Sequence, residues 1–278
     1  MSVLRAIVLG IVQGITEFAP ISSSGHLIVV PWLLGWEPLR DPSLDKAFDV
    51  ALHLGTLAGA VAYFRADLRR YVAAFLRSVR SRRIEGTDAR VAWAIAVGTI
   101  PGAVVGATFE DLIQERLGAP ALIAAMLVVF GIVLVVVDRV ADSGRSMEDV
   151  TVRRGLLLGL AQAVALQPGV SRSGITITAA RAMGLDRPTA ARVSFLLSLP
   201  IIAGAGLWKG IGLVRDGFPA GMAAPFLAGT LAAAVSGLAV IWFLLSYLRR
   251  HAFGVFLAYR VAAAAVILAA IAAGRPAA

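Results

Sequence analysis

The chain has 278 residues, of which 59% are hydrophobic and only 15% are charged, and its mean hydropathy is +0.83. Soluble domains average roughly 45–50% apolar and about 25% charged residues, so a soluble enzyme and a disordered chain are excluded. The chain has no cysteine, which excludes a disulfide scaffold and thiolate chemistry. We therefore expect a protein that crosses a membrane several times.

The formal net charge of +9 does not indicate nucleic-acid binding, because the arginines cluster in short segments between long apolar runs. Positive charge in such loops is typical of the cytoplasmic side of a membrane protein. The first apolar run leads into polar residues without a small-residue cleavage site, so we expect no cleaved signal peptide.

An apolar segment at 3–33 comes first, but Pro20 and a run of three serines interrupt its middle. Each arm has about 15 residues, whereas a spanning helix needs about 20. Proline and serine end one helix and begin another, so we expect a re-entrant hairpin. Irregular backbone at membrane depth is tolerated only inside protein or beside a water-filled cavity. The break is therefore a candidate site.

Three continuous apolar spans are expected after this hairpin, at 47–64, 90–107 and 119–138. A second interrupted segment follows at 153–184, with Pro168, Gly169 and two serines at its centre, and we expect a second re-entrant hairpin there. Three more spans complete the chain, at 191–213, 222–247 and 252–273.

The two interrupted segments match at a constant offset of 149 positions. Leu9-Gly10 corresponds to Leu158-Gly159, Ser22 to Ser171, and further along Gly98-Thr99 resembles Gly229-Thr230. We interpret the chain as a duplication in one integrated membrane domain, with a first repeat at 1–138 and a second at 139–278. Three spans per half is an odd number, so the halves should have opposite orientations. The predicted fold is an all-α polytopic membrane protein with an inverted repeat.

Loop charges predict the orientation. The segment 65–89 has seven arginines and is expected in the cytoplasm, whereas the acidic segment 108–118 is expected outside. Both termini then lie outside. The first hairpin enters from outside and the second from the cytoplasm, so their tips can meet within the membrane.

Polar groups inside a membrane are costly and are functional candidates by default. The densest set surrounds the first break and comprises Gln13, Glu17, Ser22, Ser23, Ser24 and His26. Gln13 and Glu17, four residues apart, share a helix face, and Ser23 and His26, three apart, do the same. A carboxylate, a hydroxyl and an imidazole there could form a nucleophile with its base. Alternatively, the serines only cap the second half-helix and Glu17 pairs with an arginine.

The second break has Ser171, Arg172, Ser173 and Thr176. A guanidinium suits phosphate oxygens, and each break begins a half-helix whose free N–H groups favour an anion. Two such ends and Arg172 would form a pocket for a strongly negative group. The alternative is that Arg172 only neutralises Glu17.

Two further sets of residues have open roles. Asp49 and His53, four residues apart, form either a helix-face pair or part of a site. Arg260 lies inside the last span, where we expect a buried structural partner.

These motifs resemble a known family. The stretch 13–26, QGITEFAPISSSGH, resembles the first motif of bacterial undecaprenyl-diphosphate phosphatases, and PGVSRSG at 168–174 with Thr176 resembles the second. Tyr259-Arg260 in the last span also resembles the family, and the resemblance covers essentially the whole chain. It implies removal of the terminal phosphate from undecaprenyl diphosphate, recycling of the lipid carrier for cell-wall synthesis, and bacitracin resistance.

The expected mechanism is phosphoryl transfer at an outward-facing pocket. Ser23 is the expected nucleophile, with His26 or Glu17 accepting its proton and Arg172 stabilising the phosphoryl charge. A rival scheme makes His26 the nucleophile. The expected substrate-binding residues are Gln13, Ser22, Ser24, Ser171, Ser173 and Thr176. A different function, transport or flipping of a phosphorylated polyprenyl lipid, also suits inverted repeats with broken helices.

A divalent cation, Mg²⁺ or Ca²⁺, is expected from the resemblance, bound together with the diphosphate. The family's first motif often has two glutamates, and here Gln13 takes the place of the first, so Glu17 is the possible metal ligand. The expected partners are a polyprenyl diphosphate lipid and the bilayer, without nucleic acid. The expected location is the bacterial inner membrane, with the site facing outside.

Overall fold

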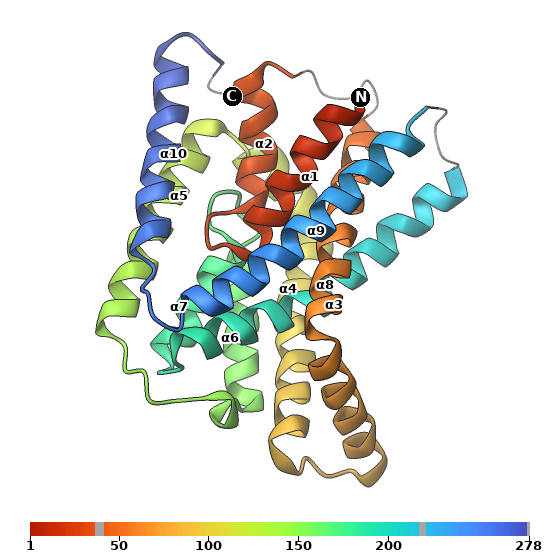
Figure 1. The fold of residues 1–278 in the computed structure, drawn as a ribbon, viewed down its shortest axis with the longest axis vertical. Helices are drawn as coiled ribbons and strands as arrows, with labels where there is room; N and C mark the ends of the chain where they lie inside the picture. The colour runs from red at the N-terminus through yellow and green to blue at the C-terminus, as the bar shows by residue number, and fades with distance from the viewer. Residues whose placement is uncertain (37–41, 217–220, 277–278) are drawn as a thin grey trace.

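The computed structural model describes residues 1–36, 42–216 and 221–276. Within these ranges the chain forms ten α-helices, one short 3₁₀ helix and no strand longer than an isolated bridge (Figure 1). The first half contains α1 (Val3–Phe18), α2 (Ser23–Leu34), α3 (Pro42–Ser81), α4 (Gly86–Leu117) and α5 (Pro120–Val140). The second contains η1 (Met147–Asp149), α6 (Val152–Val164), α7 (Arg172–Ala182), α8 (Arg187–Asp216), α9 (Ala223–Tyr247) and α10 (Gly254–Ala272). The predicted all-α class is confirmed.

Six of the described helices are long and apolar enough to cross a membrane, and they coincide with the six expected spans: α3, α4, α5, α8, α9 and α10. Their outer faces are apolar as well. On α9, large exposed side chains recur every three or four residues, at Leu227, Leu231, Val235, Leu238 and Trp242. Such a stripe would be unfavourable in water and fits contact with lipid.

Each interrupted segment forms two short helices joined by a break, as predicted. α1 and α2 have 16 and 12 residues, and α6 and α7 have 13 and 11. In Figure 1, α1 and α2 occupy the upper half of the molecule and α6 and α7 the lower half, so the two breaks face each other near the middle. An inverted duplication would give this arrangement; the duplication itself stays an interpretation of the sequence.

Two expected loops are wrong in extent. α3 is 40 residues long and continues through most of 65–89, and α4 runs to Leu117 through most of 108–118. At 1.5 Å per residue, α3 is about 60 Å long, roughly twice the hydrocarbon thickness of a bilayer. Arginine, alanine and leucine are all good helix formers, so charge ends the apolar span without ending the helix.

Helices of the two halves pack against one another. α1 lies against α9, α4 against α6, and α5 against α10. At two of these contacts the backbones touch: a methyl group on Gly10 would strike the Gly229 backbone, and one on Gly159 would strike the Gly98 backbone. Gly10 corresponds to Gly159 and Gly98 to Gly229 in the sequence. The positions that match in sequence therefore make matching contacts in the fold, α1 with α9 and α6 with α4, and each contact joins one half to the other.

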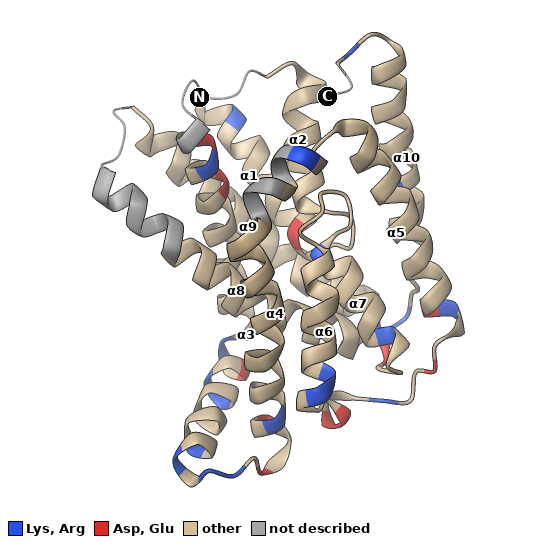
Figure 2. Ribbon diagram, turned by 180° about the vertical axis from the view of Figure 1, so that it is seen from behind, with Lys and Arg blue, Asp and Glu red and all other residues tan. Residues whose placement is uncertain are grey.

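Charge is distributed along the long axis of the molecule. Figure 2 shows Lys and Arg gathered where α3 meets α4 and where α6 begins, and Figure 1 shows both termini at the opposite end. The buried Arg181 of α7 donates to the Asp138 carboxylate of α5 at 2.7 Å, which ties the second hairpin to the end of α5.

Candidate active site

The backbone has the same unusual conformation at both breaks. Ser22 and Ser171 both have φ of 77°, a region that residues other than glycine rarely adopt. Their hydroxyl oxygens accept hydrogen bonds from the N–H groups of Gly25 (3.3 Å) and Gly174 (3.1 Å), which caps α2 and α7. Such strain is of order 1–3 kcal/mol per residue and clusters at functional sites.

The two breaks are hydrogen-bonded to each other. The Gly169 N–H donates to the Ser22 hydroxyl at 3.0 Å, and the Ser173 hydroxyl donates to the Ala19 carbonyl at 3.0 Å. The expectation that the two tips meet is therefore confirmed. The contact is not symmetric, because Pro20 occupies the position equivalent to Gly169 and has no N–H to donate.

Glu17, at the end of α1, is the centre of the polar cluster and is only 4% exposed. Its carboxylate accepts a hydrogen bond from the Gln13 amide at 2.9 Å and forms an ion pair with Arg172 of the second break. The Ser23 side chain lies beside this carboxylate, and the His53 imidazole of α3 lies 3.6 Å away. Four helices thus contribute to the surroundings of one acid.

Ser23 and Arg172 are the first residues of α2 and α7 and are equivalent at the offset of 149. The positive end of a helix dipole favours an anion and disfavours a cation, so Arg172 lies where its charge needs compensation. Glu17 supplies that compensation here. Because the Arg172 side chain is 18% exposed, it can also reach a ligand, and its second nitrogen already donates to the Ser198 carbonyl at 3.2 Å.

His26 does not join this cluster. Its Nδ1 lies 2.7 Å from the Ser22 carbonyl oxygen, and its Nε2 lies 2.8 Å from the Tyr259 hydroxyl of α10. The Tyr259 ring also stacks on it, with centroids 5.6 Å apart. The expected Ser23–His26 pairing on one helix face is thus replaced by a contact between His26 and the other half of the chain.

The predicted substrate-binding residues divide into two groups. Ser24 is exposed, whereas five others are buried: Gln13, Ser22, Ser171, Ser173 and Thr176. Thr176, for example, shares a hydrogen bond of 2.6 Å with Ser194 of α8. Among the buried hydroxyls, those of Ser22 and Ser173 bond the opposite break. A direct contact with substrate stays a prediction for all six residues.

The sequence left the role of His53 open. For Arg260 it predicted a buried structural partner but did not identify that partner. The i,i+4 spacing from Asp49 made His53 a candidate site residue, but nothing in the sequence of α3 indicates that its imidazole faces Glu17. Arg260 is fully buried and donates to the carbonyls of Gly169 at 2.9 Å and Val170 at 2.6 Å. Its partner is therefore the backbone of the second break.

No group of three or more His, Cys, Asp or Glu side chains is placed to hold a metal ion in the described part of the chain. The oxygen atoms that could bind a metal ion at the site belong to the Glu17 carboxylate and the Gln13 side chain. The Gln13 oxygen is buried and has no hydrogen-bond partner among the described residues. Mg²⁺ commonly binds through one or two carboxylates plus substrate phosphates. The residues therefore fit an ion that arrives with a diphosphate and do not form a closed protein site.

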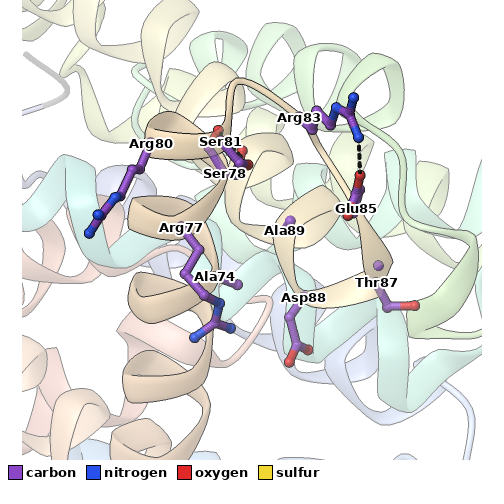
Figure 3. Close-up of a pocket in the computed structure, with 11 residues that line it drawn as sticks. Ala74, Arg77, Ser78, Arg80, Ser81, Arg83, Glu85, Thr87, Asp88 and Ala89 are labelled. Carbon is purple, nitrogen blue, oxygen red and sulfur yellow. Dashed lines mark hydrogen bonds and ion pairs between the residues drawn. The ribbon is translucent and has the colours of Figure 1, made fainter.

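A cleft of about 800 Å³ lies far from these residues, at the turn between α3 and α4 (Figure 3). Figure 3 shows that the Arg77, Arg80 and Arg83 side chains lining it point in different directions, and Arg83 lies 3.7 Å from Glu85. Because these cations do not converge on one point, the cleft is not the phosphate site.

Known proteins of similar sequence are phosphatases of a lipid diphosphate. The chain matches the family described as "Bacitracin resistance protein BacA" over residues 6–266. An undecaprenyl-diphosphatase of Geobacter sulfurreducens is 47% identical over 270 residues, which are 97% of this chain and 98% of the relative. The undecaprenyl-diphosphatase of Gemmatimonas aurantiaca is 48% identical over 273 residues, 98% of this chain and 99% of the relative. That of Thermomicrobium roseum is 45% identical over 276 residues, 96% and 98% respectively.

Proposed function

The chain belongs to the bacitracin resistance protein BacA family, and we propose that it hydrolyses undecaprenyl diphosphate to undecaprenyl phosphate and inorganic phosphate. This reaction recycles the lipid carrier of cell-wall synthesis, and it confers bacitracin resistance. The enzyme is an integral membrane protein, in keeping with its six apolar helices.

The observation that best supports phosphoryl chemistry is the meeting of Ser23, Glu17 and Arg172 where two half-helices begin. The hydroxyl is a nucleophile, the carboxylate beside it is a proton acceptor, and the guanidinium with two helix N-termini favours phosphoryl oxygens. A transporter would need the anion site but not a hydroxyl beside a carboxylate.

In the proposed reaction, the diphosphate draws Arg172 away from Glu17 and onto its phosphoryl oxygens. The freed carboxylate accepts the Ser23 proton as Oγ attacks the terminal phosphorus. The new Oγ–P bond forms while the bond to the bridging oxygen breaks, so undecaprenyl phosphate leaves. Water then attacks the phosphoserine. The Oγ–P bond breaks, Oγ takes back the proton held by Glu17, and the oxygen and protons of the water leave with the released phosphate. Arg172 and the helix N-termini stabilise the charge in both steps.

We extend the proposal to an Mg²⁺ or Ca²⁺ ion that enters with the diphosphate. Glu17 and the free Gln13 oxygen would hold it. Such an ion supplies positive charge that neutralises the phosphoryl oxygens.

We also place the enzyme in the bacterial inner membrane with its site open to the outside. The support is the basic end formed by α3 and α4, which the positive-inside tendency assigns to the cytoplasm. The termini and the opening of the first hairpin then face outward.

The deciding experiment is phosphate release from undecaprenyl diphosphate by the purified protein in detergent. We expect one phosphate per monophosphate lipid formed. A Ser23→Ala preparation, purified identically, excludes a contaminating phosphatase. EDTA should lower the rate, and Mg²⁺ or Ca²⁺ should restore it. Absence of phosphate release from folded protein would contradict the enzyme assignment, and full activity in EDTA would contradict the ion.

A further inference from the structure

Neighbouring residues of α10 contact both breaks. Tyr259 reaches the first break, because its hydroxyl is hydrogen-bonded to His26 and its ring stacks on the imidazole. Arg260 reaches the second break and donates from one nitrogen to two successive carbonyls, those of Gly169 and Val170. A single turn of one helix therefore contacts both halves of the site.

The contacts of His26 assign its hydrogen. The Ser22 carbonyl oxygen can only accept a hydrogen bond, so the neighbouring Nδ1 carries the hydrogen. In the neutral ring, Nε2 then accepts from the Tyr259 hydroxyl. A base for Ser23 would need that lone pair, and the tyrosine already occupies it.

Arg260 is unusual because it is completely buried and its Nε and Nη1 have no hydrogen-bond partner among the described residues. A buried cation with so few partners is costly, which a purely structural helix contact would not require. Gly131 of α5 makes room for it, since a methyl group there would lie 3.0 Å from the Arg260 Cδ. This arrangement places a guanidinium against the second break.

The bonds form a closed circuit through the site. Tyr259 bonds His26, and His26 bonds the Ser22 carbonyl. The Ser22 hydroxyl accepts from the Gly169 N–H, and the Gly169 carbonyl accepts from Arg260, the residue after Tyr259. Ser22 immediately precedes the proposed nucleophile. The circuit therefore couples the position of Ser23 on one break to that of Arg172 on the other.

We infer that Tyr259 and Arg260 form a clamp that holds the two breaks in register, with His26 as the link to the first break. All three are positioning residues of the reaction, and none transfers a proton. This inference rests on the proposed phosphatase function, because register matters only if Ser23 and Arg172 act on one substrate.

Three variants test the clamp: Tyr259→Phe, His26→Ala and Arg260→Lys. A misplacement of about 1 Å can lower a rate a hundredfold, so we expect kcat/KM to fall about ten- to a hundredfold in each. Tyr259→Phe should add little to His26→Ala in the double variant, because both break the same link. The pH dependence of kcat/KM should keep its shape in all of them.

Hydrogen exchange by mass spectrometry gives a readout that does not depend on turnover. Amides at 167–171 should exchange faster in Tyr259→Phe and Arg260→Lys, while the amides of α5 and α10 keep their protection. General destabilisation would instead raise exchange throughout both helices and lower the thermal midpoint. Tyr247→Phe is the matched control, because Tyr247 stacks on His251 in the same way, 4.3 Å between centroids, away from the site.

Wild-type rates and wild-type exchange in folded Tyr259→Phe and Arg260→Lys would overturn the clamp. Loss of one limb of the pH profile in His26→Ala would show that His26 transfers a proton, which overturns its positioning role. If the wild-type protein releases no phosphate, the proposed function fails, whereas the exchange measurement still supports or overturns the coupling of the breaks.

Discussion

At the scale of single residues, the ion pair between Glu17 and Arg172 needs a reason beyond stability. Removing two charges from water costs several kcal/mol per ion, and a buried pair is often no more stabilising than apolar residues of the same size. The pair also joins the two halves of the chain, and Arg172 keeps 18% of its side chain accessible. An arginine that can exchange its carboxylate for a phosphate accounts for both features.

Replacing Arg172 tests that exchange. Arg172→Ala should lower kcat/KM at least about a hundredfold, the scale of losing one preorganised donor to a developing charge. Arg172→Lys should recover little, because one ammonium cannot bond the Ser198 carbonyl and a phosphate with the same fork geometry. Steady-state phosphate release measures both.

Arg275→Lys serves as the control, since Arg275 is exposed and lies over the Trp32 ring away from the site. Turnover of Arg172→Lys near the wild-type rate would show that only the charge matters, not the two-pronged geometry.

Ser23 is the second residue with a sharp expectation. Ser23→Ala should abolish single-turnover phosphate release, because the attacking oxygen is removed while Glu17 and Arg172 remain. Its thermal midpoint should change little, because the caps of α2 and α7 are Ser22 and Ser171. Ser246→Ala, on α9, is a matched serine control. An acid-labile phosphohistidine accumulating in Ser23→Ala would instead favour His26 as the nucleophile.

Only part of this site could be predicted from the sequence. The Gln13–Glu17 bond follows from i,i+4 spacing within one helix, and it forms at 2.9 Å. For Ser23 and His26 the same spacing gives no hydrogen bond here, because the imidazole contacts the Ser22 carbonyl and the hydroxyl of Tyr259, which lies 233 positions away. Spacing predicts neighbours on a helix, whereas packing against another helix decides which side chain each one contacts.

At the scale of helices, local composition located the breaks but not every helix end. Proline, glycine and serine runs correctly separated α1 from α2 and α6 from α7. The ends of α3 and α4 were misplaced because the expectation equated the limit of an apolar span with the limit of a helix. Hydropathy predicts which residues lie in the bilayer, whereas helix propensity predicts how far the helical backbone continues.

The glycine contacts between helices give a prediction at this scale. Gly159→Ala should lower stability by about 1–3 kcal/mol, because its methyl group would overlap the Gly98 backbone. Gly204→Ala should leave stability unchanged or raise it by up to about 1 kcal/mol, since Gly204 is helical and has nothing within 4 Å of the new group. Thermal melts in detergent compare the two. Equal midpoints would contradict a tight contact between α4 and α6.

At the scale of the whole molecule, neither half contains a complete site. Glu17 and Ser23 come from the first half, Arg172 from the second, and the backbone of each break is bonded to the other. The sequence offset suggested two related halves, but it could not show that α1 packs on α9 or α4 on α6. Contacts between distant segments arise only in the folded chain.

Orientation is the property of the whole molecule that the proposed function depends on, and the absence of cysteine makes it measurable. Ser81→Cys lies at the basic end beside the turn between α3 and α4, Ala273→Cys lies at the end of α10, and Ser24→Cys is exposed beside the site. Each single-cysteine variant can be treated in spheroplasts with a maleimide that does not cross membranes.

Because positive charge favours the cytoplasm, Ala273→Cys and Ser24→Cys should react in intact spheroplasts, and Ser81→Cys only after permeabilisation. The substrate diphosphate should slow labelling at Ser24→Cys but not at Ala273→Cys, since only the former lies beside Ser23. Labelling of Ser81→Cys from outside would reverse the proposed topology. Reaction of Ser24→Cys only after permeabilisation would place the opening of the site on the cytoplasmic face, where lipid diphosphate outside the cell could not enter.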